Sequence, residues 1–77
     1  MNISISDFMV HVGELLPPQS MAHLENEIRD QPGVISAKFS CRAPHLMMVA
    51  LNPDLASSAA ILNRVASKGL RATLVGL

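Results

Sequence analysis

The apolar side chains of this chain follow two periods in a fixed order, and that order constrains the fold more than any other feature. Four segments place an apolar residue at every second position, which is typical of strands, and two place it at helical spacing. The predicted strands cover about residues 7–13, 34–41, 45–51 and 70–76, and the predicted helices about residues 17–31 and 57–68. The order of elements is therefore βαββαβ.

Residues that start and stop helices lie at these boundaries. Pro17 and Pro18 suit a first helical turn, because proline lacks the amide hydrogen that this turn leaves unpaired. Ser57 or Ser58 can cap the second helix with a hydroxyl group, and Gly69 can adopt the left-handed conformation that ends it. The local signals thus agree with the periodicity.

Elements this short, joined by tight connections, predict one α+β domain over residues 1–77, with the ferredoxin-like architecture of a two-layer sandwich. Right-handed crossovers place both helices on one face of an antiparallel sheet with the strand order four-one-three-two. The opposite face of the sheet has no predicted element to cover it.

Composition excludes several classes of protein. Six basic and six acidic side chains cancel, and Phe8 and Phe39 are the two aromatic residues, so the chain lacks the features of a nucleic-acid binder. Cys41 is the single cysteine and has no partner for an internal disulfide. The longest apolar run, residues 46–51, is far shorter than the about 20 residues of a membrane-spanning helix, and no secretion signal is recognisable. We expect a cytoplasmic protein with no membrane insertion.

Several short motifs occur in an order and spacing known from one family. They are Val10-x-Val12-Gly13, Leu24 with Ile28, Pro32-Gly33-Val34, Asn52-Pro53, Ile61-Leu62 and Lys68-Gly69-Leu70. With them, the chain resembles the heavy-metal-associated (HMA-like) domain family of small copper and mercury carriers and N-terminal modules of metal-transporting ATPases. The resemblance implies the ferredoxin-like fold and a role in metal binding or metal ion transport.

The metal motif of that family is missing here. The resemblance assigns its two thiolate ligands, in a Cys-x-x-Cys sequence, to positions that Pro17 and Ser20 occupy in this chain. Neither side chain can replace a thiolate toward a soft cation. The chain is therefore interpreted as a divergent member without the dithiol ligands.

Other metal-ligating side chains are predicted at the same end of the domain. His11, His45 and Cys41 are candidate ligands for zinc, copper or nickel, and Glu14 offers a further carboxylate oxygen. Simpler interpretations exist for each. His45 suits a hairpin hydrogen bond, and Cys41 alternates with Ile35 and Phe39, which predicts a small buried residue facing the helices. His23 is expected to be solvated.

The uncovered sheet face is predicted to be apolar at its centre. By strand parity it carries Met9, Leu46, Met48 and Val75, together with His11, and polar side chains flank it. An open antiparallel face normally alternates apolar with polar residues, so this composition favours an interface. A homodimer is the simplest form of it, because one patch then serves both copies.

No nucleophile, paired base or phosphate-binding loop appears in a recognisable arrangement, so we expect no enzymatic activity. The leading hypothesis is a small binding or adaptor protein that associates with a protein partner through the open face. Transition-metal binding or trafficking through His and Cys ligands is the alternative. A regulatory module that senses a small ligand is the second alternative.

Overall fold

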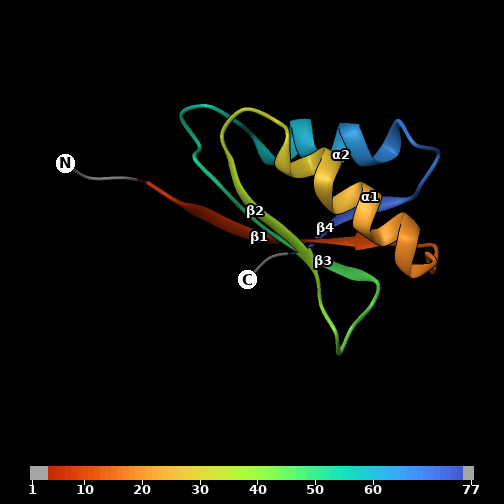
Figure 1. Cartoon of the computed structure of the whole chain (residues 1–77). Coiled ribbons are helices and arrows are strands. Elements are labelled where there is room, and N and C mark those ends of the chain that lie inside the picture. The colour runs from red at the N-terminus through yellow and green to blue at the C-terminus, as the bar shows by residue number, and fades with distance from the viewer. Residues whose placement is uncertain (1–3, 76–77) are drawn as a thin grey trace.

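The computed structural model describes residues 4–75 of the chain, and its elements follow the expected order (Figure 1). They are β1 (Ser6–Val12), α1 (Pro18–Arg29), β2 (Val34–Phe39), β3 (Leu46–Leu51), α2 (Ser58–Ala66) and β4 (Ala72–Val75). The predicted end of the last strand, at residue 76, lies outside the described residues.

The four strands form one antiparallel sheet in the order β2-β3-β1-β4, which confirms the predicted ferredoxin-like arrangement. The strands β1 and β3 lie at the centre. Both helices lie side by side over one face, so the molecule has two layers (Figure 1). No helix of residues 4–75 lies over the second face of the sheet, which we call the open face.

The core lies between the sheet and the helices. Val10 and Val12 of β1 have no exposed surface, nor has Met47 of β3, and Ile28 and Val65 cover them from the two helices with the same complete burial. Each such side chain contributes about 1.5–3 kcal/mol by leaving water. Burial of alternate residues in β1 and β3 therefore fixes which side chains project from the open face.

The two helices begin differently. Pro17 precedes α1 in an extended conformation, and no side chain caps this helix. Pro18 in the first turn has no amide hydrogen, so that position needs no hydrogen-bond acceptor. Ser57 precedes α2, and its Oγ accepts a hydrogen bond of 3.1 Å from the amide of Ala60. The predicted proline start and serine cap are both present.

Two predictions for the second strand are wrong. A bulge lies between Val34 and Ser36, so Val34 packs against the core while Ile35, predicted to face the helices, is 52% exposed. The strand also ends at Phe39 instead of residue 41. Cys41 therefore lies beyond it, exposed, where burial against the helices was predicted.

Candidate metal site

His11 projects from the open face near the end of the central strand β1. Its neighbours across the sheet are Leu46 on β3 and Thr73 on β4. The residues on either side of it in the chain, Val10 and Val12, are fully buried on the helix side, so the backbone at His11 is firmly held. The side chain itself is exposed.

His45 lies just before β3 and contacts the same end of β1. Its Nδ1 lies 2.8 Å from the carbonyl oxygen of Val12, and its own carbonyl accepts a 2.8 Å hydrogen bond from the amide of Val12. A carbonyl can only accept, so Nδ1 carries the hydrogen and donates it. In the neutral ring this leaves Nε2 with its lone pair free to bind a ligand.

The structure brings His11 and His45 together. Their ring centroids are 5.6 Å apart, and the ring planes differ by 15°, so the two imidazoles are stacked. The sequence places both residues at one end of the domain. It does not reveal the contact, which depends on the register of β1 against β3 and on a residue that belongs to no strand.

Within the described residues, no third ligand joins this pair. Among residues 4–75, no three His, Cys, Asp or Glu side chains lie close enough together to hold one ion, so Cys41 stands apart from the two histidines. Glu14 is engaged elsewhere. Its carboxylate accepts a 2.9 Å hydrogen bond from the amide of Arg71, which lowers the pKa of Glu14, and lies 3.6 Å from the Arg71 guanidinium.

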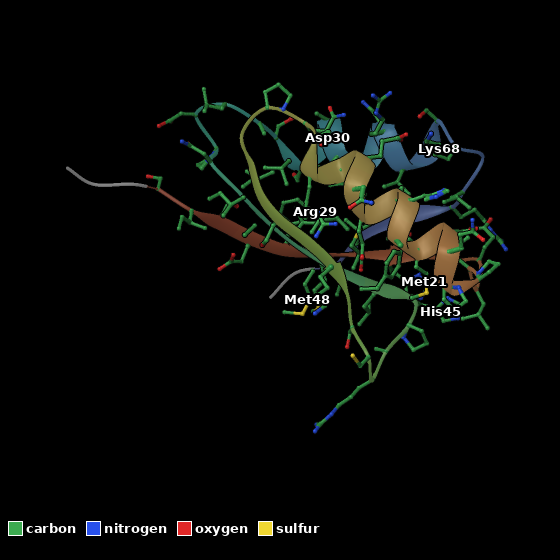
Figure 2. All side chains as sticks on the ribbon, in the orientation of Figure 1. Met21, Arg29, Asp30, His45, Met48 and Lys68 are labelled. Carbon is green, nitrogen blue, oxygen red and sulfur yellow. The ribbon has the colours of Figure 1, made fainter. Side chains whose placement is uncertain are left out.

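The apolar row predicted on the open face is present. Met9 lies between Met48 on β3 and Val75 on β4, and Lys38 follows on the outer side of Met48. Met48 is 55% exposed and points away from the helices (Figure 2). Asp7, which the sequence analysis did not single out, lies on the same face beside Ala50. The face thus combines an apolar centre with His11 near one end, and the His45 ring stacks on His11 there.

No protein-family model and no curated protein matches the chain. Solved structures do match it. The N-terminal soluble domains of Bacillus subtilis CopA superpose with a TM-score of 0.80 at 21% identity, over 92% of this chain and 48% of that one. A copper binding domain from HMA7, a P-type ATPase, gives 0.81 at 17% identity, over 91% and 93% of the two chains. The chain has a heavy-metal-associated-like fold.

A third match agrees with these two. The CsoZ metallochaperone superposes with a TM-score of 0.79 at 13% identity, over 91% of this chain and 99% of that one. The chain spans about half the length of the CopA structure and nearly all of the CsoZ one. Within residues 4–75, neither helix has the length and apolar character needed to cross a membrane.

In this heavy-metal-associated-like fold, the positions assigned to the family dithiol carry no ligand. Pro17 precedes α1, and Ser20 lies in its first turn. Ser20 lines a hollow of about 260 Å³ on the helix side, together with Leu16, His23, Leu24, Glu27, Lys68 and Leu70.

An ion-pair cluster that the sequence analysis missed borders this hollow. The Glu27 carboxylate of α1 lies 3.7 Å from Arg64 Nε of α2 and 2.6 Å from Nζ of Lys68, which follows that helix. The hydrogen bond from Lys68 lowers the pKa of Glu27, and the positive charges of Lys68 and Arg64 act in the same direction. The cluster joins the two helices, and its opposite charges were the only signal available in the sequence.

Proposed function

We propose that the chain is a non-enzymatic cytoplasmic binding module that holds a transition-metal ion with the imidazoles of His11 and His45. The observation that carries the proposal is the pairing of the two rings together with the tie from His45 Nδ1 to the Val12 carbonyl. Histidines that bind metals commonly donate their second ring hydrogen to a carbonyl or carboxylate in this way. The tie selects the tautomer and orients Nε2 before an ion arrives.

To share one ion, the two rings must leave their stacked arrangement. A tetrahedral ion with bonds of about 2.0–2.1 Å holds two nitrogens about 3.3 Å apart. His11 is exposed and can turn about its side-chain bonds, so it can close the gap from rings whose centroids are now 5.6 Å apart. His45 stays in place through its hydrogen bond. Imidazole nitrogen favours zinc, copper or nickel.

Two ligands leave part of the coordination sphere open. The chain supplies no third His, Cys, Asp or Glu within residues 4–75, so water or another molecule completes the sphere. Such an ion exchanges readily, which is a useful property in a carrier that passes its cargo on. Protons compete for the same nitrogens, so occupancy falls as pH is lowered.

A zinc titration followed by NMR tests the proposal, since zinc is diamagnetic and leaves the imidazole signals observable. We expect saturable shifts of the ring signals of His11 and His45 and of the Val12 amide. His11→Asn and His45→Asn should each weaken binding at least tenfold. His23→Asn is the matched control, since His23 is exposed on α1, and it should bind like the natural chain. Shifts that fail to saturate at neutral pH would refute the proposal.

Protein association through the open face is the second candidate function. It is supported by the exposed Met48 at the centre of that face, next to Met9. Methionine is flexible and polarisable and suits surfaces that adapt to a partner. Replacement of Met48 by Lys tests it: self-association of the natural chain, measured by sedimentation at micromolar concentration, should be lost in the variant. A chain that sediments as a monomer under all conditions would contradict this candidate.

A further inference from the structure

The hollow on the helix side of the molecule has the size and the lining of a small-ligand site. It lies between α1 and the segment that connects α2 to β4, and its volume is about 260 Å³. Pockets that hold drug-sized ligands measure about 300–1,000 Å³, and they combine apolar walls with a few polar groups. This hollow therefore suits a smaller molecule of mixed character.

The lining is apolar along its length and charged at one end. Ser20 and Glu27 lie two turns apart on α1, which separates them by about 10 Å. Leu24 lies between them on the same face of the helix, and Leu16 and Leu70 complete the apolar surface. The charged end is the one at Glu27, whose carboxylate lies 2.6 Å from Nζ of Lys68.

The exposed charge at that end is positive. Lys68 and Arg64 share the single carboxylate of Glu27, so two positive charges stand against one negative charge. Oε2 of Glu27 is buried, and no hydrogen-bond donor within residues 4–75 reaches it, whereas the side chain of Lys68 is 45% exposed. An ammonium group has three hydrogens to donate, and Glu27 Oε1 occupies one of them, so Lys68 can still donate to a ligand.

We infer that this hollow binds a short aliphatic carboxylate, with its carboxylate group at Lys68 and its hydrocarbon chain along Leu24 and Leu70. Hydrogen bonds between an ammonium group and a carboxylate are charge-assisted, and burial of the chain removes apolar surface from water. A cationic ligand would meet the positive charges of Lys68 and Arg64 instead. The site uses neither His11 nor His45, so the inference is independent of the proposed metal site.

A titration of the full chain with 4-methylpentanoate tests the inference. Amide NMR spectra at neutral pH and constant ionic strength should show saturable shifts at Ser20, His23 and Leu70. We expect a Kd on the order of 1 mM, because the ligand is small and the charge that holds it is partly exposed.

Two matched compounds separate the contributions of the charge and the chain. The alcohol 4-methylpentan-1-ol has the same chain without the charge and should bind about fivefold more weakly. Acetate has the charge without the chain and should bind at least about tenfold more weakly, because it buries far less apolar surface.

Two variants of the charged pair should change the affinity for 4-methylpentanoate in opposite directions. Lys68→Gln removes the ammonium group and should weaken binding about fivefold, whereas Glu27→Gln removes the competing carboxylate and should strengthen it about two- to fivefold. Mere disturbance of the helix pair would weaken binding in both variants. Lys38→Gln is the matched control, because Lys38 is exposed on β2 beside Met48, and it should bind like the natural chain.

Three results would overturn the inference. The first is the absence of saturable shifts around the hollow at millimolar ligand. The second is equal affinity for the alcohol and the carboxylate, which would mean that the hollow takes only the apolar chain. The third is a loss of affinity in Lys68→Gln and Glu27→Gln alike, since the positive charge would then have no part in binding.

Discussion

Two consecutive methionines show how differently the two faces of this sheet are used. Met47 projects toward the helices and has no exposed surface, whereas Met48 projects from the open face and is 55% exposed. Both lie in β3 and have the same side-chain chemistry. The difference arises from strand parity alone, because successive side chains point to opposite sides of a sheet.

The comparison shows that packing on the helix side of the sheet positions the side chains that project from the open face. Val10 and Val12 are fully buried, and they flank His11, which is exposed. Packing on the helix side therefore holds the backbone at the histidine without using its side chain. Stability and ligand binding are carried by alternate residues of the same strands, so single substitutions can separate the two properties.

The largest expected effect comes from truncating each methionine in turn. Met47→Ala removes a fully buried side chain and leaves a cavity, which should lower the free energy of unfolding by about 2–5 kcal/mol. Met48→Ala removes an exposed side chain and should change it by less than about 0.5 kcal/mol. Urea unfolding of both variants, followed by circular dichroism, measures the difference.

The same experiment can contradict the expected difference between the two faces. If Met48→Ala destabilised the isolated chain as much as Met47→Ala, the open face would be part of the core of a dimer that exists without metal. A dependence of the unfolding midpoint on protein concentration would then accompany the loss.

A smaller effect is expected at the bulge in β2, which places Val34 against the core and leaves Ile35 exposed. Val34 is partly buried and packs on the core, while Ile35 is 52% exposed. Val34→Ala should lower the free energy of unfolding by about 1 kcal/mol, and Ile35→Ala by less than about 0.5 kcal/mol, although Ile35 is the larger side chain. Both changes remove a β-branched residue, so loss of strand propensity cancels in the comparison. The reverse order of losses would mean that the strand is regular, with Ile35 inside.

The sequence predicted the fold because the fold depends on periodicity. Alternation in β1 and β3 was sufficient to assign Met47 to the core and Met48 to the open face. The bulge was missed because the residues from Val34 to Cys41 alternate without a break; it follows Gly33, whose φ of +89° places it in the left-handed region. An added Cβ there would lie 2.7 Å from Leu55 Cβ, so the turn is also held by a close approach that no local pattern reveals.

The candidate site was predictable only in part. Topology placed His11 and His45 at one end of the domain, but the hydrogen bond from His45 to the Val12 carbonyl joins residues 33 positions apart. Cys41 was assigned to the strand by alternation. The strand ends earlier because the Ser40 hydroxyl accepts hydrogen bonds of 3.3 Å from the amides of Arg42 and Ala43, which turns the chain away.

The smallest expected effect concerns acid, and it should belong to the helix side of the molecule. The hydrogen bond from Lys68 holds the pKa of Glu27 below the ordinary value of 4.5 in the folded chain. Since the folded value is the lower one, the contribution of Glu27 to stability is present above pH 4.5 and is lost as pH falls through the folded value.

Glu27→Gln removes this contribution, so the variant should lose less stability than the natural chain between neutral and acidic pH. Met48→Ala should keep the acid dependence of the natural chain, because Met48 projects from the other face. The effect is small because the ion pair is exposed to solvent and screened by salt, so urea unfolding should be measured at low ionic strength at each pH. An identical pH dependence in Glu27→Gln and the natural chain would show that the charged cluster between the helices contributes nothing to stability.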